Sequence, residues 1–111
     1  MADISFFRNC IQSVLTEYSR RRANQADVKT QTIFDTDRDH YQLLYMGWDG
    51  YRRVFYPIVH LDIQHDKIWI QHNATEELVA DNLMNLGVDR NDIVLGIHHP
   101  SLRPYTDFAT V

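Results

Sequence analysis

Apolar positions at the start of the chain recur at the spacing of an α-helix. They fall on one face of residues 3 to about 22, while polar side chains fall on the other. Asp3 is suited to cap the first turn, because its carboxylate can accept the free backbone N–H groups there. We therefore predict an amphipathic helix, followed by a polar break at residues 23–27. The apolar stripe consists of Ile4, Phe7, Ile11, Val14, Leu15 and Tyr18.

The middle of the chain predicts an antiparallel meander of four strands. Segments rich in β-branched and aromatic residues alternate with short polar turns, and short connections imply antiparallel neighbours. Asp49-Gly50 is a strong signal for a two-residue hairpin. Pro57 predicts a bulge or an edge position in the third strand, because proline cannot donate to the ladder. The predicted strands are residues 28–36, 41–48, 53–63 and 67–72.

The last third of the chain predicts a second helix and one short strand. Asn73 or Thr75 can cap the helix, and Gly87 between two apolar residues is typical of a helix end. Residues 93–97 form a short apolar strand, and the remaining tail is expected to be irregular. The prediction is a single α+β domain over residues 1–111, with the element order α-β-β-β-β-α-β.

The second and third predicted strands are apolar on both faces, although a sheet packed on one side alternates apolar with polar residues. Two explanations are open. The first helix and the tail can cover the second face within the monomer, or that face contacts another copy or a different protein. Under strict alternation one face carries Tyr41, Leu43, Tyr45, Phe55, Val59, Leu61 and Ile63, and the other carries Leu44, Met46, Trp48, Val54, Tyr56 and Ile58.

The charge balance disfavours a protein that binds nucleic acid alone. The chain has 15 acidic and 11 basic residues, a net charge of −4, whereas such binding is dominated by cations that neutralise phosphates. The one basic cluster, residues 20–22, closes the first helix. Its arginines complement the negative end of the helix dipole, or they make a local contact with nucleic acid.

The cysteine count and the hydropathy indicate a cytoplasmic protein. The single cysteine, Cys10, excludes an internal disulfide and lies in the apolar stripe of the first helix, where it is expected to pack as a small apolar residue. The N-terminus lacks the basic and apolar regions of a signal peptide, and no segment reaches the ~20 apolar residues of a membrane span.

His60 and Asp62 are the strongest candidates for chemistry, because they project from the same face of one strand. They can orient each other, share a metal, or form a small hydrolytic or nuclease-like cluster with Lys67. The chain contains no CxxC or HExxH motif and no glycine-rich phosphate loop. We therefore predict a hydrogen-bonded pair, no metal, no cofactor and no enzymatic activity, with a metal-dependent nuclease or hydrolase using His60 and Asp62 as the alternative.

Several sequence blocks, in order along nearly the whole chain, resemble the XisI family. They are residues 35–44 with Gly47-Trp48, residues 60–63, residues 67–71, residues 75–77, residues 92–96 and residues 105–109. The resemblance implies an excision controlling factor for the fdxN element, a DNA element removed by a separate recombinase. It also implies an XisH-like, nuclease-type partner. An antitoxin-like restraint of that partner is a further alternative.

The resemblance brings no catalytic residues, so the functional prediction is a contact surface. The resemblance favours an exposed contact face over a fully covered sheet. That face would be used by an XisH-like protein, a second copy of the chain, or both. Direct binding of nucleic acid by the chain alone is not expected. The candidate contact residues are Trp48, Val54, Tyr56, Ile58, His60, Asp62, Trp69 and Tyr105.

Overall fold

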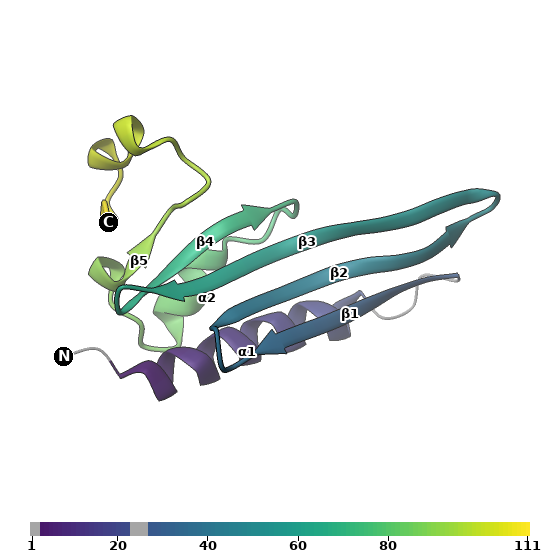
Figure 1. Cartoon of the computed structure of the whole chain (residues 1–111), viewed down its shortest axis with the longest axis horizontal. Coiled ribbons are helices and arrows are strands. Elements are labelled where there is room, and N and C mark those ends of the chain that lie inside the picture. Colours follow the sequence, from purple (N-terminus) through teal and green to yellow (C-terminus); the bar gives the residue numbers. More distant parts are fainter. Residues whose placement is uncertain (1–2, 23–26) are drawn as a thin grey trace.

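A long helix lies across one face of a five-stranded sheet (Figure 1). The computed structural model describes residues 3–22 and 27–111, so most of the predicted polar break at 23–27 lies outside the described residues. The predicted α+β class and element order are confirmed, with two 3-10 helices added. The elements are α1 (Ile4–Arg21), β1 (Val28–Asp35), β2 (His40–Asp49), β3 (Arg52–Gln64), β4 (Lys67–Asn73), α2 (Val79–Asn85), η1 (Arg90–Asp92), β5 (Ile93–Val94) and η2 (Pro100–Tyr105).

Helix α1 begins and packs as its sequence pattern predicts. The Asp3 side chain accepts a hydrogen bond from the backbone N–H of Phe6 at 3.1 Å, which satisfies one of the free donors of the first turn. Most of the predicted stripe is buried against the sheet, together with Cys10, which is 5% exposed. Burial raises the pKa of the Cys10 thiol, so this side chain packs as a small apolar residue.

The four antiparallel strands follow each other in the order β1-β2-β3-β4, and β5 adds to the β4 edge in parallel. The β2–β3 loop is Gly50-Tyr51, one residue later than the predicted Asp49-Gly50, because Asp49 still pairs with Arg52. Gly50 has a φ of 63°, which glycine adopts without strain at the first position of such a loop. The predicted meander is thus confirmed, and most strand ends are displaced by one residue from the prediction.

A polar clamp joins α1 to the turn between β1 and β2. The Arg8 guanidinium donates to both carboxylate oxygens of Asp39, at 2.8 and 3.2 Å, and the Tyr41 hydroxyl donates to the same carboxylate at 2.7 Å. The arginine holds the pKa of Asp39 below its usual value, whereas burial and the adjacent carboxylate raise that of Tyr41 to about 12. The clamp fixes the helix axis relative to the strand that carries His40.

Helix α2 is shorter than predicted. It covers Val79–Asn85, and Asn73 and Thr75 do not cap it. Their side chains instead accept backbone N–H groups two residues further on, at 2.9 and 3.0 Å, which holds the β4–α2 loop in successive turns. The predicted end at Gly87 is confirmed, since it has a φ of 110° and the N–H of Val88 reaches back into the last turn.

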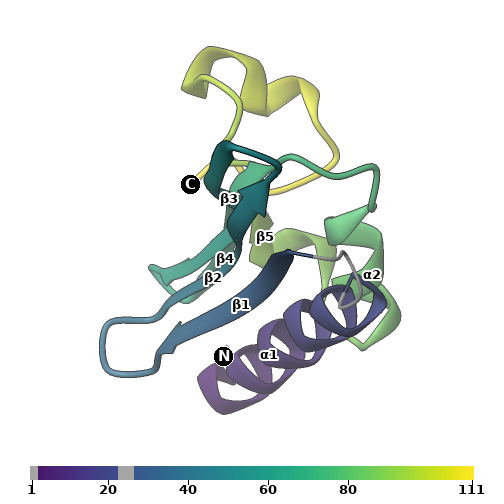
Figure 2. The same ribbon diagram turned by 90° about the vertical axis from the view of Figure 1, so that its right-hand side faces the viewer.

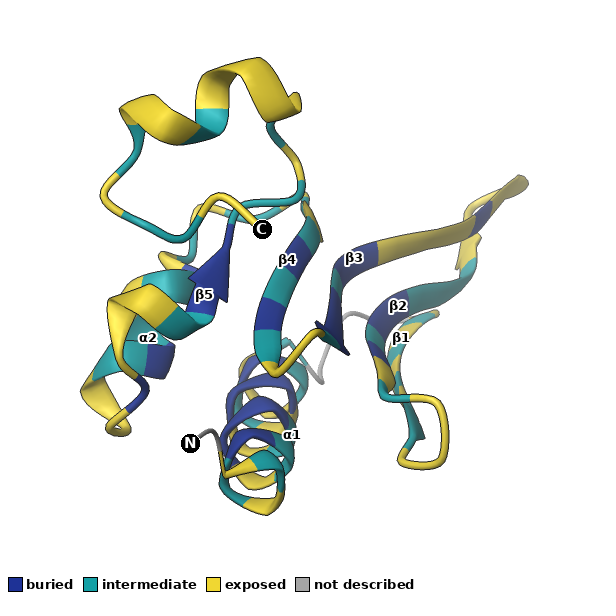
Figure 3. Cartoon of the chain, turned by 60° about the vertical axis from the view of Figure 1, so that its left-hand side comes forward, coloured by how far each residue is buried: buried dark blue, intermediate teal, exposed yellow. Residues whose placement is uncertain are grey.

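Both helices lie on the same side of the sheet, and the far ends of β2 and β3 extend beyond α1 as a hairpin (Figures 1 and 2). We call residues 45–56 the hairpin arm, and the sheet surface turned away from α1 and α2 the outer face. Buried positions concentrate between α1 and the sheet, while the arm is largely exposed (Figure 3). The molecule measures 47 × 30 × 24 Å. No helix in the described part of the chain has the length and apolarity that a membrane crossing requires.

Candidate functional site

A β-bulge beside Pro57 decides which face of β3 is buried. Leu43 pairs with Val59 and Leu44 pairs with Pro57, which leaves Ile58 as the extra residue. Ile58 and Val59 are adjacent, yet both belong to the core, at 1% and 0% exposure. The bulge therefore interrupts the alternation of side chains between the two faces of the strand.

The bulge corrects the predicted grouping of the contact residues. Val54 and Tyr56 share the helix-side face with Ile58, whereas His60 and Asp62 lie on the outer face. The expectation that Val54, Tyr56, Ile58 and His60 share one face was wrong, because it assumed unbroken alternation. Ile58 is a core residue and cannot form part of an exposed contact surface.

Both α1 and α2 lie on the other side of the sheet (Figure 2), and the outer face exposes large apolar side chains on β1, β2 and β3. Ile33 in β1, Trp48 in β2 and Phe55 in β3 are about half exposed, at 49%, 50% and 59%. The Arg53 guanidinium lies over the Trp48 ring, 5.4 Å from its centroid, and supplies a positive charge beside these apolar side chains. At the tip of the arm, the Tyr51 side chain is fully exposed.

The C-terminal tail covers the opposite end of the outer face. Trp69 of β4 packs there against Gly96, and the Arg103 guanidinium lies 5.1 Å from the Trp69 ring centroid. The tail is tied to the sheet by the backbone bond from Ile97 to Ile70 and by the bridge between Val94 and Ala109. Coverage within the monomer is thus real at β4, whereas Ile33, Trp48 and Phe55 on β1, β2 and β3 are left open. Tyr105, at the end of η2, is 88% exposed.

The helix-side surface of the arm is hollowed where it extends beyond α1. A depression of about 510 Å³ is lined by Val28, Tyr45, Val54 and Tyr56, among others. Tyr45 and Tyr56 face each other across β2 and β3 with ring centroids 5.4 Å apart. The arm therefore presents aromatic side chains on both of its faces.

Two histidines converge on one buried carboxylate in the outer face. His40 is directly opposite Asp62 in the register of β2 and β3, and His60 lies two residues before Asp62 in the same strand. The His40 Nδ1 and His60 Nε2 atoms lie 2.7 and 2.8 Å from the Asp62 Oδ1 atom. Gln71 of β4 donates to the other carboxylate oxygen at 3.3 Å. The predicted pair of His60 and Asp62 is confirmed as a hydrogen-bonded pair.

Sequence reasoning missed His40 as the third member of this cluster. The predicted second strand began at Tyr41 and left His40 out, but the strand begins at His40, whose pairing with Asp62 depends on the bulge at Ile58. Without the bulge, the register from Leu43 back to His40 would be displaced by one residue, and a different side chain would face His40. Only a correct placement of the bulge at Pro57 would have identified this residue from the sequence.

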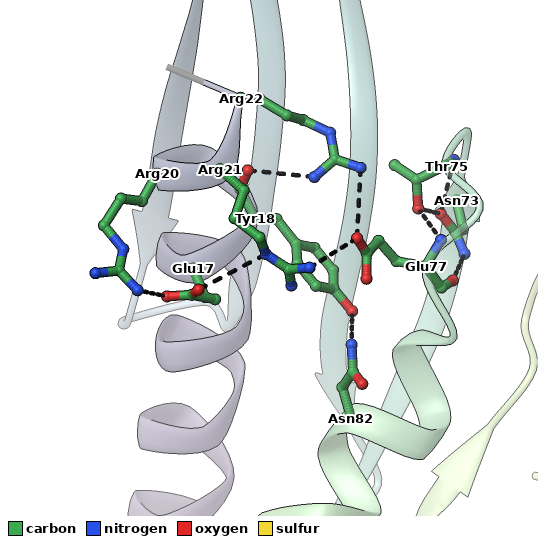
Figure 4. A network of polar contacts seen from close by, with 9 residues as sticks. All are labelled: Glu17, Tyr18, Arg20, Arg21, Arg22, Asn73, Thr75, Glu77 and Asn82. Atoms are coloured by element: carbon green, nitrogen blue, oxygen red, sulfur yellow. Dashed lines mark hydrogen bonds and ion pairs between the residues drawn. The ribbon is translucent and has the colours of Figure 1, made fainter. Parts of the chain in front are cut away.

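The arginine cluster at the end of α1 forms ion pairs with two carboxylates (Figure 4). Arg20 pairs with Glu17, and Arg21 bridges Glu17 and Glu77 at 3.6 and 3.1 Å. Arg22 lies 3.8 Å from Glu77 and also donates to the backbone carbonyl of Tyr18. Because two carboxylates neutralise much of the cluster, it ties α1 to the β4–α2 loop and offers little net charge for a phosphate backbone.

Comparison with known proteins places the chain in a family. The family model described as XisI protein matches residues 1–110, and the chain belongs to the XisI family. The crystal structure of a XisI-like protein from Anabaena variabilis ATCC 29413 superposes with a TM-score of 0.93 at 38% identity, covering 98% of this chain and 100% of that one. No significant match is found among curated proteins.

A second crystal structure from the same organism carries a functional description. The fdxN element excision controlling factor XisI from Anabaena variabilis ATCC 29413 has a TM-score of 0.84 at 38% identity, covering 96% of this chain and 97% of that one. The fold described above is therefore shared along nearly the whole length of both proteins.

Proposed function

We propose that this chain is an accessory protein in the control of site-specific excision of a DNA element, and that it acts through a protein partner without catalysing the excision. The observation that carries the proposal is the 38% identity over 96% of the chain to a protein described as an fdxN element excision controlling factor. Family membership over residues 1–110 supports the same role.

The exposed apolar side chains on the outer face support a role in binding. Large apolar side chains exposed in one contiguous area are enriched at protein–protein contacts, where aromatic residues and arginine predominate. Trp48, Phe55 and Arg53 lie together on the arm, whereas Ile33 lies further along the outer face, where β1 pairs with Gln42. Trp48 and Phe55 would form the centre of the contact, because covering large apolar side chains stabilises a complex.

The charge distribution favours a protein partner over DNA as the direct contact. The chain carries a net charge of −4, and its densest basic cluster is paired with Glu17 and Glu77. A surface of this kind gains little from the release of counterions that drives binding to DNA. The partner that fits is an XisH-like, nuclease-type protein, which would supply the contact with DNA. A second copy of the chain bound to the same surface would produce a homo-oligomer.

Co-purification with an XisH-like protein tests this proposal and locates the contact. The tagged chain and the partner are expressed together, and the retained partner is quantified after affinity capture. We expect the Trp48→Ser and Phe55→Ser double variant to lose at least about tenfold in affinity, because buried aromatic anchors commonly contribute more than 1.4 kcal/mol to binding.

A matched control comes from exposed apolar residues on the helix side. Leu78 and Leu86, which flank α2, are 66% and 46% exposed, so the Leu78→Ser and Leu86→Ser double variant removes comparable apolar surface elsewhere. We expect this variant to retain the partner fully. Equal loss in both double variants, or no complex with the unchanged chain at micromolar concentration, would contradict the proposal.

A nuclease assay separates the accessory role from the alternative of a small metal-dependent hydrolase. The isolated chain is incubated with single- and double-stranded DNA in the presence of Mg²⁺ or Mn²⁺, beside the His60→Ala variant. We expect the unchanged chain to cleave DNA no more than the His60→Ala variant does. Cleavage that disappears with His60→Ala would assign the chemistry to the cluster around Asp62 and would replace the accessory role.

A further inference from the structure

We propose that His40, His60 and Asp62 form a binding site for one divalent ion of the zinc class, set in the outer face of the sheet. The coordinating atoms available are two imidazole nitrogens and one carboxylate oxygen, all within 4.8 Å of one another. They come from two neighbouring strands whose register places them together. The proposal does not rest on the excision role, since the site belongs to the isolated chain. It revises the sequence-based prediction of no metal, which did not include His40 as a third ligand.

The ligand set selects the kind of metal. Zinc and related transition ions favour imidazole with carboxylate, and sites with three protein ligands leave one position for water or another group. Calcium requires six to eight oxygen ligands, and magnesium prefers carboxylates with several waters, so a site with a single carboxylate suits neither ion. The ions expected to bind are therefore Zn²⁺, Co²⁺ and Ni²⁺.

Burial shows that the carboxylate is held in position. Within the described residues, Asp62 is the one charged side chain that is buried, with 6% of its surface exposed. A carboxylate removed from water needs compensating donors or cations. The two imidazoles and the Gln71 amide supply donors in the metal-free arrangement. A bound cation would compensate the same charge more directly.

The surrounding residues support the ligands as they do in established metal sites. Gln71 donates to the second oxygen of Asp62 and thereby fixes the orientation of the carboxylate. Trp69 pairs with Asp62 across β3 and β4, and the tail holds this tryptophan in place through Arg103. The His40 side chain is 50% exposed and that of His60 is 28% exposed, so an ion can enter from the solvent side.

Only a small adjustment separates the hydrogen-bonded arrangement from a coordinated one. The ligand nitrogens lie 2.7 and 2.8 Å from Asp62 Oδ1. Bonds of about 2.0–2.1 Å in a tetrahedron require ligand atoms about 3.3–3.4 Å apart, so each imidazole would move away from Asp62 Oδ1 by roughly half an ångström. The two imidazole nitrogens, which lie within 4.8 Å of each other, would take the same separation. The exposed position of His40 permits this movement without a change in the core.

Calorimetric titration with Zn²⁺ of the full chain, after removal of metal with a chelator, tests the site. We expect one ion per chain, and visible absorption typical of tetrahedral coordination when Co²⁺ replaces zinc. The His40→Ala and His60→Ala variants should each weaken binding by at least about tenfold, since even the loss of a residue that only hydrogen-bonds a metal ligand costs about 10–100-fold. His40→Ala is the decisive variant, because a half-exposed side chain contributes little to the fold.

The controls separate this site from general affinity of histidines for zinc. His65, in the β3–β4 turn, has a φ of 51°, a conformation that asparagine tolerates, so His65→Asn removes a nearby imidazole without strain. We expect this variant to bind as tightly as the unchanged chain, and Gln71→Ala to retain one ion with about tenfold weaker affinity. Absence of stoichiometric binding, or binding unaffected by both His40→Ala and His60→Ala, would overturn the proposal.

Discussion

Alanine substitutions at the two adjacent residues Ile58 and Val59 test the bulge that sets the faces of β3. Strict alternation in a strand would bury only one of two neighbours, so only one substitution would be costly. Here both side chains are in the core, at 1% and 0% exposure. Removing the buried atoms of Ile58 should cost about 2–5 kcal/mol, and removing those of Val59 about 2 kcal/mol.

Phe55→Ala is the matched control on the same strand. Its side chain is larger than either core residue but is 59% exposed, and its cross-strand neighbour is Met46. We expect this substitution to cost less than about 1 kcal/mol, the usual range for a cross-strand surface pair.

Urea unfolding followed by far-ultraviolet circular dichroism measures all three variants. With an m value of about 1–3 kcal/mol/M, the midpoint should fall by roughly 1 M or more for Ile58→Ala and by less for Val59→Ala. If only one of the two core substitutions is destabilising, or if Phe55→Ala is as costly as Ile58→Ala, the bulge and the face assignment derived from it are wrong.

Three further results follow from single residues. Asp39→Asn should lower the free energy of unfolding at pH 7 by about 1 kcal/mol. This difference should vanish as the pH falls through and below about 4, because a carboxyl whose folded pKa is depressed stabilises the fold only while it is ionised. Denaturant titrations from pH 7 to pH 3 measure the difference. Gly47→Ala should lower the free energy of unfolding by at least about 2 kcal/mol, since the φ of Gly47 is 153° and the new Cβ would lie 2.1 Å from the Asp27 carbonyl oxygen. Gly50→Ala should cost less, because a Cβ at Gly50 meets no atom within 4 Å. Cys10 should react with a thiol reagent at neutral pH only after unfolding, because it is buried and its pKa is raised, and rapid reaction in the folded protein would contradict its burial.

Local patterns predicted the elements of the fold well, because each pattern reflects the packing of its own segment. The stripe of α1, the alternation of apolar runs with short turns, and the glycine at the end of α2 depend on neighbours a few residues away. The start of α2 was misplaced because Asn73 and Thr75 are equally suited to capping a turn and a helix. Sequence alone does not decide between these two uses of the same side chains.

The candidate site depended on long-range register, which local patterns do not contain. Pro57 indicated a bulge, but its exact position determined whether Ile58 would face the core and whether His40 would face Asp62. One extra residue changes the face of every later side chain, so the predicted contact surface combined residues from two faces. The exposed state of Trp48 and the partial coverage of Trp69 likewise depended on where the C-terminal tail would pack.

Side-chain footprinting of the chain, with and without an XisH-like partner, tests most directly whether the outer face is a contact surface. Hydroxyl radicals label exposed aromatic side chains, and Trp48 and Phe55 are both about half exposed in the free chain. We predict that the partner protects these two residues and leaves Leu78 and Leu86 on the helix side unchanged. Protection confined to the helix side, or no protection at Trp48 and Phe55 in a formed complex, would contradict the account.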